Sequence, residues 1–168
     1  MCKINSLYSK PLFLTLAAFL ALLSGFVAEH FFKLRPCSLC LFQQYVFMAI
    51  CLIGCAAILL PFLRGHTKKI SLFLAILYVI NAGIAFYQVA VEHHWVEPPT
   101  QCQNKKLSGN SIEEMREQLL NTETVRCDHV QWSLFGISMA GYNALYCLFL
   151  GIIAFYFLRR QKKERKPL

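Results

Sequence analysis

Two cysteines separated by two residues, Cys37 and Cys40, are the part of the sequence with the clearest capacity for chemistry. They stand immediately before a strongly apolar run that begins at Leu41. If 41–60 forms a helix, Cys40 lies at its N-terminal edge, where unpaired N–H groups and the helix dipole favour a negative charge. A thiol in that position loses its proton more easily, and the thiolate is the reactive form. The pattern therefore predicts a redox-active cysteine at the mouth of an apolar helix.

The composition indicates that this helix lies in a membrane. Of the 168 residues, 57% are hydrophobic and 15% are charged, and the mean hydropathy is +0.46, which excludes an ordinary water-soluble fold. We predict an all-α integral membrane protein, a four-transmembrane-helix bundle in one domain over 1–168, with spans at about 11–28, 41–63, 70–91 and 137–158. A cleaved signal peptide is the competing interpretation of 11–28. We favour a retained span, because the apolar run is longer than a signal core of about 7–15 residues.

The basic residues indicate how the spans are oriented. They gather in the N-terminal segment 1–10, in the turn at 64–69 and in the tail at 159–166, and the net charge is +8. The loops at 29–40 and 92–136 hold fewer of them, and the longer loop carries most of the acidic residues. By the positive-inside rule, both termini are expected in the cytoplasm and both loops in the periplasm.

Four cysteines fall in these two outward loops: Cys37 and Cys40 in the first, Cys102 and Cys127 in the second. One interpretation is a structural disulfide between Cys102 and Cys127, which would stabilise the long loop by roughly 3 kcal/mol. A four-thiolate zinc site is a weaker one, because such sites usually combine two closely spaced pairs. A dithiol relay, in which electrons enter one pair and leave by the other through thiol–disulfide exchange, accounts for more of the layout.

The long loop also carries the signals of a short helix. The run 111–114 (Ser-Ile-Glu-Glu) is typical of a capping box, and Ile112, Met115 and Leu119 share one face of the helix that would follow. Such a helix could lie on the bilayer surface and hold the loop cysteines near the first pair, or pack on the protein itself. We therefore expect a short loop helix on the periplasmic side.

Two stretches of the sequence resemble the bacterial disulfide bond formation protein B (DsbB) family. One is 36–40 (Pro-Cys-Ser-Leu-Cys) before the second span, and the other is 127–139 (CDHVQWSLFGISM) at the entry to the last span. With the four spans and the two loop cysteines, the resemblance covers nearly the whole chain. It implies a protein of the bacterial inner membrane with its active face in the periplasm. The implied enzyme is a protein-dithiol:quinone oxidoreductase that reoxidises a periplasmic thioredoxin-like thiol oxidase (DsbA-type) and passes the electrons to ubiquinone or menaquinone, sustaining disulfide bond formation.

The resemblance also implies a role for each outer cysteine. Cys102 would form the mixed disulfide with the partner oxidase, and Cys127 would be its pair. Cys37 would exchange with the long loop, and Cys40 would meet the quinone as a thiolate. A close alternative is an enzyme resembling the vitamin K epoxide reductase family, which shares the four-helix and Cys-x-x-Cys plan. A non-enzymatic membrane scaffold with one structural disulfide is the alternative of a different class.

One position departs from the family pattern. Similar proteins usually carry an arginine, linked to the quinone, four residues after the second motif cysteine, and here that position is Gln44. Glutamine can donate a hydrogen bond to a quinone carbonyl, but it supplies no positive charge. Arg35 is near in sequence and could compensate, and His93 stands at the outer end of the third span, so the expected quinone-binding residues are Gln44, Arg35 and His93. For Asn143, near the start of the last span, we expect a hydrogen bond between helices.

Overall fold

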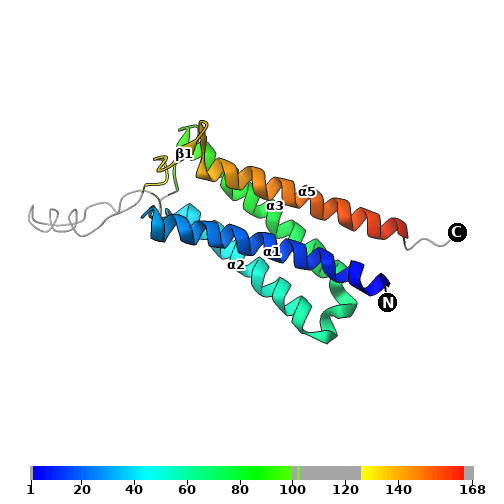
Figure 1. Ribbon diagram of the computed structural model, residues 1–168. Coiled ribbons are helices and arrows are strands. Elements are labelled where there is room, and N and C mark those ends of the chain that lie inside the picture. Colours follow the sequence, from blue (N-terminus) through cyan, green and yellow to red (C-terminus); the bar gives the residue numbers. More distant parts are fainter. Residues whose placement is uncertain (1, 100–101, 103–125, 165–168) are drawn as a thin grey trace, which may run out of the picture.

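Long helices make up most of the computed structural model, which describes residues 2–99, 102 and 126–164 (Figure 1). In chain order the elements are α1 (Cys2–Phe31), α2 (Ser38–Leu59), the short 3-10 helix η1 (Pro61–His66), α3 (Thr67–Glu92), the strands β1 (Ser133–Leu134) and β2 (Ile137–Ser138), and α5 (Met139–Glu164). Within the described residues, four segments are long and apolar enough to cross a membrane: Pro11–Phe31, Ser38–Leu59, Thr67–Glu92 and Met139–Arg159. The predicted all-α bundle of four spanning helices is confirmed. The expected loop helix near 111–119 lies outside the described residues.

The corner between the second and third spans is set by a proline. Leu60 adopts an extended conformation (φ −91°, ψ 112°), which is the region favoured before proline, and α2 therefore ends at Leu59. Pro61 then opens η1, where its fixed φ and missing N–H are tolerated. The sequence prediction had continued the second span to 63.

A two-stranded hairpin precedes the last span. Ser133 pairs with Ser138 and Leu134 with Ile137 in an antiparallel ladder. The two turn residues between the strands, Phe135 and Gly136, both have positive φ (50° and 78°), as a tight two-residue hairpin turn requires. Because 137 and 138 belong to this hairpin, the last helix begins at Met139, two residues later than the sequence prediction placed it.

Small side chains allow the helices to approach closely. The main buried cluster draws on all four spanning helices, and alanines of α1, α3 and α5 make up much of it. Helices in a lipid bilayer associate through such close packing, because the hydrophobic effect does not drive them together there. Tyr78 is fully buried at the centre, and its hydroxyl donates to the main-chain carbonyl of Leu14 at 2.6 Å. Large apolar side chains such as Phe19, Leu52 and Phe149 face outward, where lipid would contact them.

The four helices run side by side, and their ends fall into two groups (Figure 1). The N-terminal end of α1, the corner at η1 and the C-terminal end of α5 lie at one end of the bundle. The hairpin and the N-terminal end of α2, which carries Cys37 and Cys40, lie at the opposite end. We call this second end the hairpin end of the bundle. All the chemistry described below is located there.

Candidate functional site

Cys37 and Cys40 are positioned by the first turn of α2. Cys37 is the N-cap residue, with an extended backbone (φ −74°, ψ 169°), and its Sγ accepts a hydrogen bond from the main-chain N–H of Cys40 at 3.3 Å. Cys40 lies within this first turn, where the unpaired N–H groups and the helix dipole favour negative charge on its sulfur. The two Sγ atoms are 2.8 Å apart, so that one thiol can donate a hydrogen bond to the other.

The environment of Cys37 determines which of the two sulfur atoms carries the proton. Cys37 is only 4% exposed. Its hydrogen bond with Cys40, and then its burial, raise the pKa of the Cys37 thiol well above the ordinary value. Cys37 therefore keeps its proton at neutral pH and can donate it to the sulfur of Cys40. The geometry favours Cys40 as the thiolate of the pair.

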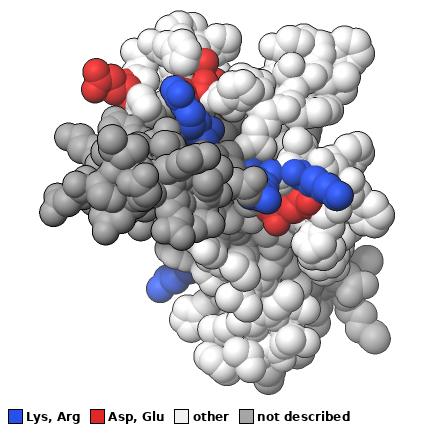
Figure 2. All heavy atoms as spheres, turned by 90° about the vertical axis from the view of Figure 1, so that its left-hand side faces the viewer, with Lys and Arg blue, Asp and Glu red and all other residues white. Residues whose placement is uncertain are grey.

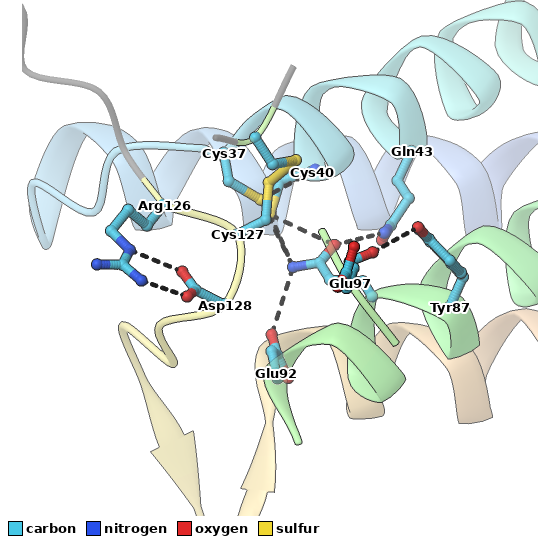
Figure 3. The surroundings of a disulfide bond; sticks show 11 residues. Cys37, Cys40, Gln43, Tyr87, Glu92, Glu97, Arg126, Cys127 and Asp128 are labelled. Carbon is cyan, nitrogen blue, oxygen red and sulfur yellow. Dashed lines mark hydrogen bonds and ion pairs between the residues drawn. A yellow bond between two sulfur atoms is a disulfide. The ribbon is translucent and has the colours of Figure 1, made fainter. Parts of the chain in front are cut away.

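The second cysteine pair lies against the first. Cys102 and Cys127 form a disulfide with their Cα atoms 5.4 Å apart. Both are buried, and both belong to the same apolar cluster as Cys37, with Cys40 packed against it. Figure 3 shows Cys127 directed toward Cys37 and Cys40 at the start of α2. The structure thus brings all four cysteines predicted from the outward loops into one water-poor cluster.

Gln88 of α3 connects the thiol pair to the bundle. Its side chain is 4% exposed, and its Nε2 lies 3.3 Å from the Cys40 Sγ and 3.6 Å from the Cys37 Sγ. The same nitrogen is 3.4 Å from Oε1 of Glu92, one helical turn further along α3. Oε2 of Glu92 is buried and, among the described residues, has no hydrogen-bond partner. The amide of Gln88 therefore contacts both sulfur atoms directly, and the Glu92 carboxylate contacts that amide.

Two further amides extend this contact across the bundle. Gln43 of α2 donates from Nε2 to the Gln88 Oε1 at 2.8 Å, and Asn143 of α5 donates from Nδ2 to the Gln43 Oε1 at 2.5 Å. The hydrogen bond expected between Asn143 and another helix is present, with Gln43 as its partner. Gln43 is 5% exposed, so these amides meet in an environment where an unpaired polar group would be costly.

A cavity of about 670 Å³ opens beside the thiol pair. Its wall is formed by α1, the loop before α2, α2, the last turns of α3, the first turns of α5, and the hairpin with the chain on either side of it, and it includes Cys37 and Cys40. Most of the surface of the lining is apolar, and polar side chains such as Glu29, Gln43 and Gln88 also contribute to it. Cavities that bind small molecules have this character and usually measure about 300–1,000 Å³. The cavity therefore has the size and the lining to hold an apolar ring next to Cys40.

Gln44, the position that departs from the family pattern, lies on this wall and is held by α1. Its Nε2 donates to Oε1 of Glu29 at 2.6 Å. Gly25 of α1 makes room for it, since a Cβ at this glycine would come within 3.2 Å of the Gln44 Nε2. The cavity wall at this point thus carries a carboxylate and an amide in hydrogen-bond contact.

The other two predicted quinone-binding residues lie in different places. Arg35 lines the cavity from the loop before α2. His93 is exposed at the end of α3, stacked on Trp95 with ring centroids 5.2 Å apart, and it is not part of the cavity lining. The structure therefore brings Gln44 and Arg35 to the cavity and leaves His93 outside it.

Charged side chains of both signs lie on the hairpin end (Figure 2). Next to Cys127, Arg126 donates two hydrogen bonds to the Asp128 carboxylate, at 2.9 Å and 2.5 Å. The hydrogen bond from Arg126 holds the pKa of Asp128 below its usual range. Arg126 also lines the cavity, so this ion pair stands at its edge.

The sequence prediction missed four polar residues of this site: Glu29, Gln43, Gln88 and Glu92. A signal for Gln43 and Gln88 was available, because an amide inside an otherwise apolar span usually faces the protein interior. Sequence alone did not reveal which groups these amides would meet, since the partners come from three different helices.

Comparison with known proteins gives the family. A family model described as disulfide bond formation protein DsbB matches residues 9–157. A disulfide bond formation protein B from Marinobacter nauticus is 29% identical over 163 residues, which cover 91% of each chain. One from Acinetobacter baylyi is 28% identical over 157 residues, 88% of each chain. An uncharacterized protein from Rickettsia prowazekii is 28% identical over 144 residues, 82% of this chain and 81% of its own. Since the matched region contains all four spans and all four clustered cysteines, the chain belongs to the DsbB family of multi-pass membrane proteins, oxidoreductases of disulfide bond formation.

Proposed function

We propose that this protein reoxidises a DsbA-type thiol oxidase and passes the electrons to a membrane quinone, ubiquinone or menaquinone. The observation that carries the proposal is the position of two cysteine pairs in one buried cluster, with the inner pair on the wall of a cavity of about 670 Å³. A purely structural disulfide between Cys102 and Cys127 would not need two free thiols packed against it. The proposed activity is that of a protein-dithiol:quinone oxidoreductase.

Electrons would enter at the disulfide of the long loop. The thiolate of the partner oxidase attacks Cys102, forms a mixed disulfide and releases the Cys127 thiol. The second thiol of the partner then displaces Cys102, so that the partner leaves oxidised and both loop cysteines are reduced. Two electrons and two protons have then been transferred from the partner to this pair.

Exchange between the two pairs is the next step. A thiolate of the reduced loop pair attacks Cys37 of a Cys37–Cys40 disulfide, and Cys40 leaves as a thiolate. The remaining loop thiol then resolves the new mixed disulfide, which restores the Cys102–Cys127 bond and leaves Cys37 as a thiol. The shared buried cluster supports this step because it keeps the sulfur atoms close and excludes competing water.

The cavity residues support a quinone as the final acceptor. A quinone supplies an acceptor for two electrons and two protons in one molecule, and its apolar ring suits a mostly apolar lining. Gln44 and Arg35 are the residues that would hold it, the first by an amide hydrogen bond and the second by its charge. His93 lies outside the lining, so we assign the acceptor contacts to Gln44 and Arg35 rather than to His93.

A glutathione pool is a poorer acceptor on energetic grounds. A DsbA-type partner has a potential near −120 mV, and an oxidising glutathione pool lies at about −200 mV. Transfer over this gap of roughly 80 mV is uphill by about 3.7 kcal/mol for two electrons. A membrane acceptor of higher potential removes the difficulty.

The orientation proposed from the basic residues is consistent with this chemistry. The turn at 64–69 and the C-terminal end of α5 lie at the end of the bundle opposite to the cysteines, and the sequence of both regions is rich in lysine and arginine. By the positive-inside rule that end is cytoplasmic, so the hairpin end faces the periplasm of a bacterial inner membrane. A soluble periplasmic oxidase would then reach the long loop directly.

The test is quinone reduction by the purified full-length protein in detergent, with a reduced DsbA-type oxidase as the donor. We expect turnover to be lost in Cys40→Ser and in Cys102→Ser. Cys55→Ser is the matched control, because Cys55 is an exposed cysteine on the same helix, away from the cluster. Turnover that persists in Cys40→Ser would refute the relay. Absence of reduction with either quinone type would refute the quinone as acceptor.

A further inference from the structure

The hydrogen bonds that lead to Cys40 all point in one direction. Starting inside the bundle, Asn81 of α3 donates from Nδ2 to the Cys147 Sγ of α5 at 3.4 Å. The Cys147 thiol donates to the Asn143 Oδ1 at 3.5 Å. From there the chain continues through the two glutamines already described and ends with the Gln88 Nε2 at 3.3 Å from the Cys40 Sγ. Each group after Asn81 accepts a hydrogen bond on its inner side and donates one on its outer side, whereas the Asn81 Oδ1 is buried and, among the described residues, has no hydrogen-bond partner.

This direction fixes the orientation of the terminal amide. If the Gln88 amide were rotated by half a turn, its Nε2 would face the Nε2 of Gln43, donor against donor, in a buried site. Its Oε1 would then face the Cys40 sulfur. The rotated arrangement loses a buried hydrogen bond and is therefore disfavoured. The chain of amides holds an N–H group, rather than a carbonyl, toward Cys40.

The contact favours the charged form of the sulfur. A Cys40 thiol can donate to the Gln88 Oε1, but that distance is 3.7 Å, longer than the 3.3 Å to Nε2. A thiolate accepts from Nε2, and a hydrogen bond to an ionised group is about twice as strong as one between neutral groups. Gln44, where the family usually has its arginine, is bonded to Glu29 on the opposite side of the cavity wall. The Gln88 amide on α3 is therefore an uncharged hydrogen-bond donor in contact with the Cys40 sulfur, and it can stabilise a negative charge there.

We propose that Gln88 is a catalytic residue that stabilises the Cys40 thiolate through its Nε2–H, and that Gln43 and Asn143 are positioning residues that aim this amide. The inference rests on the proposed function in one respect, namely that Cys40 passes on electrons as a thiolate. The step it assists is the departure of Cys40 as a thiolate when a loop thiolate attacks Cys37 of the Cys37–Cys40 disulfide. The electron pair of the broken S–S bond stays on the Cys40 sulfur, and its negative charge is held by the amide N–H and by the first turn of α2.

Other ionisable groups line the same cavity. They come from each element packed around it: Glu29 of α1, Arg35 and Cys37 of the loop before α2, Glu92 of α3, Arg126 and His129 before the hairpin, and Tyr142 and Tyr146 of α5. Glu92 also accepts from the Gln88 amide, so each variant is compared in a Glu92→Gln background as well, where a change can be attributed to the contact with Cys40.

The experiment measures the pH dependence of Cys40 alkylation in the reduced full-length protein. Iodoacetamide is the probe, and peptide mass spectrometry reports modification at Cys40 separately from the other cysteines. Gln88→Met keeps the length of the side chain and removes the donor. Because a hydrogen bond to a charged group is lost, we expect about tenfold less thiolate at neutral pH, which moves the midpoint of the profile up by about one pH unit.

Three further variants separate the hydrogen bond from packing and from charge. Gln88→Glu keeps the shape and the oxygen that accepts from Gln43, but it places a carboxylate against the sulfur, so charge repulsion should raise the midpoint further than in Gln88→Met. Gln131→Met removes another amide that lines the cavity but is not part of the chain of amides, and it should leave the midpoint unchanged. Asn143→Leu should give a smaller rise, because the Gln88 amide remains but is no longer aimed.

The outcomes decide the proposal independently of quinone reduction. A midpoint equal to that of the wild type in Gln88→Met would overturn it, and so would an equal shift in Gln131→Met. If Gln88→Met does not fold, Asn143→Leu decides instead, and a midpoint equal to that of the wild type in this variant would overturn the proposal. Neither quinone nor partner oxidase is present in the assay, so a protein that failed to reduce quinone could still show the predicted shift.

Discussion

Substitution of Gly54 by alanine tests how closely α1 and α2 pack against each other. Gly54 is buried on α2, and a Cβ added there would overlap the Thr15 hydroxyl of α1 and come within 2.9 Å of the Thr15 Cβ. Thr15 is itself 7% exposed, and its hydroxyl donates to the carbonyl of Pro11 at 2.7 Å. Rotation of the Thr15 side chain away from the new methyl group would break this buried hydrogen bond. The two helices would have to separate.

The magnitude follows from two opposing effects. Overpacking of a tight contact usually costs about 1–3 kcal/mol. Replacement of glycine by alanine within a helix gains up to about 1 kcal/mol, because alanine is the better helix former. Gly83 of α3 offers a matched control, since a Cβ there meets no atom within 4 Å. Both variants share the helix-propensity gain, so the difference between them isolates the clash and should be about 1–3 kcal/mol.

The assay is the free energy of unfolding in mixed detergent micelles, followed by circular dichroism. We expect Gly54→Ala to be less stable than Gly83→Ala by the stated difference. Thr15→Ala removes the overlapping hydroxyl and the γ-methyl group, so Gly54→Ala should cost less in that background. Equal stability of the two alanine variants would refute the packing argument, as would a cost that does not depend on residue 15.

Three further predictions concern the thiol pair, the core and the cavity. In the reduced protein at pH 7, iodoacetamide should modify Cys40 and spare Cys37. The hydrogen bond with Cys40 and burial raise the pKa of Cys37, so that its thiol stays protonated at this pH. Equal modification of the two cysteines, measured by peptide mass spectrometry, would contradict this. Tyr78→Phe should lower the free energy of unfolding by about 1 kcal/mol, because a buried main-chain carbonyl on α1 loses its donor; unchanged stability in the detergent titration would contradict the contact. Gln44→Arg alone should change the half-saturating quinone concentration little, since the new cation would pair with Glu29, whose Oε1 is 2.6 Å from the glutamine amide. Gln44→Arg combined with Glu29→Gln should lower the half-saturating quinone concentration. Identical concentrations for the single and the double variant would refute this account.

The neutral residue at position 44 has a structural counterpart on α1. Gln44 donates to Glu29, so this part of the cavity wall holds a neutral amide bonded to a carboxylate. The amide of Gln88 contacts Cys40 and supplies a donor without charge. The departure from the family pattern is therefore one part of a polar arrangement that includes α1, α2 and α3.

Local sequence properties determined the spanning helices of this protein. Apolar runs of about 20 residues leave few alternatives in a membrane, because every main-chain polar group must be paired within the segment. The Cys-x-x-Cys spacing before such a run also predicted a reactive pair, and the structure places both cysteines at the first turn of that helix. The ends of the elements were less certain. The second helix ends before Pro61, earlier than the predicted end at 63. The hairpin turn at Phe135 and Gly136 was not predicted, because phenylalanine seldom adopts the positive φ that this turn requires.

The tertiary structure alone decided which polar groups meet at the sulfur atoms. Gln43, Gln88 and Asn143 come from three different helices, and their contact depends on how each helix is rotated about its axis and how closely it packs. The apolar runs are hydrophobic on most faces, so hydrophobic periodicity does not specify that rotation. Small residues at the contacts and the buried amides themselves specify it, through interactions between residues far apart in the chain. For the same reason the four cysteines could be predicted from the sequence, and only the fold showed which amide contacts one of them.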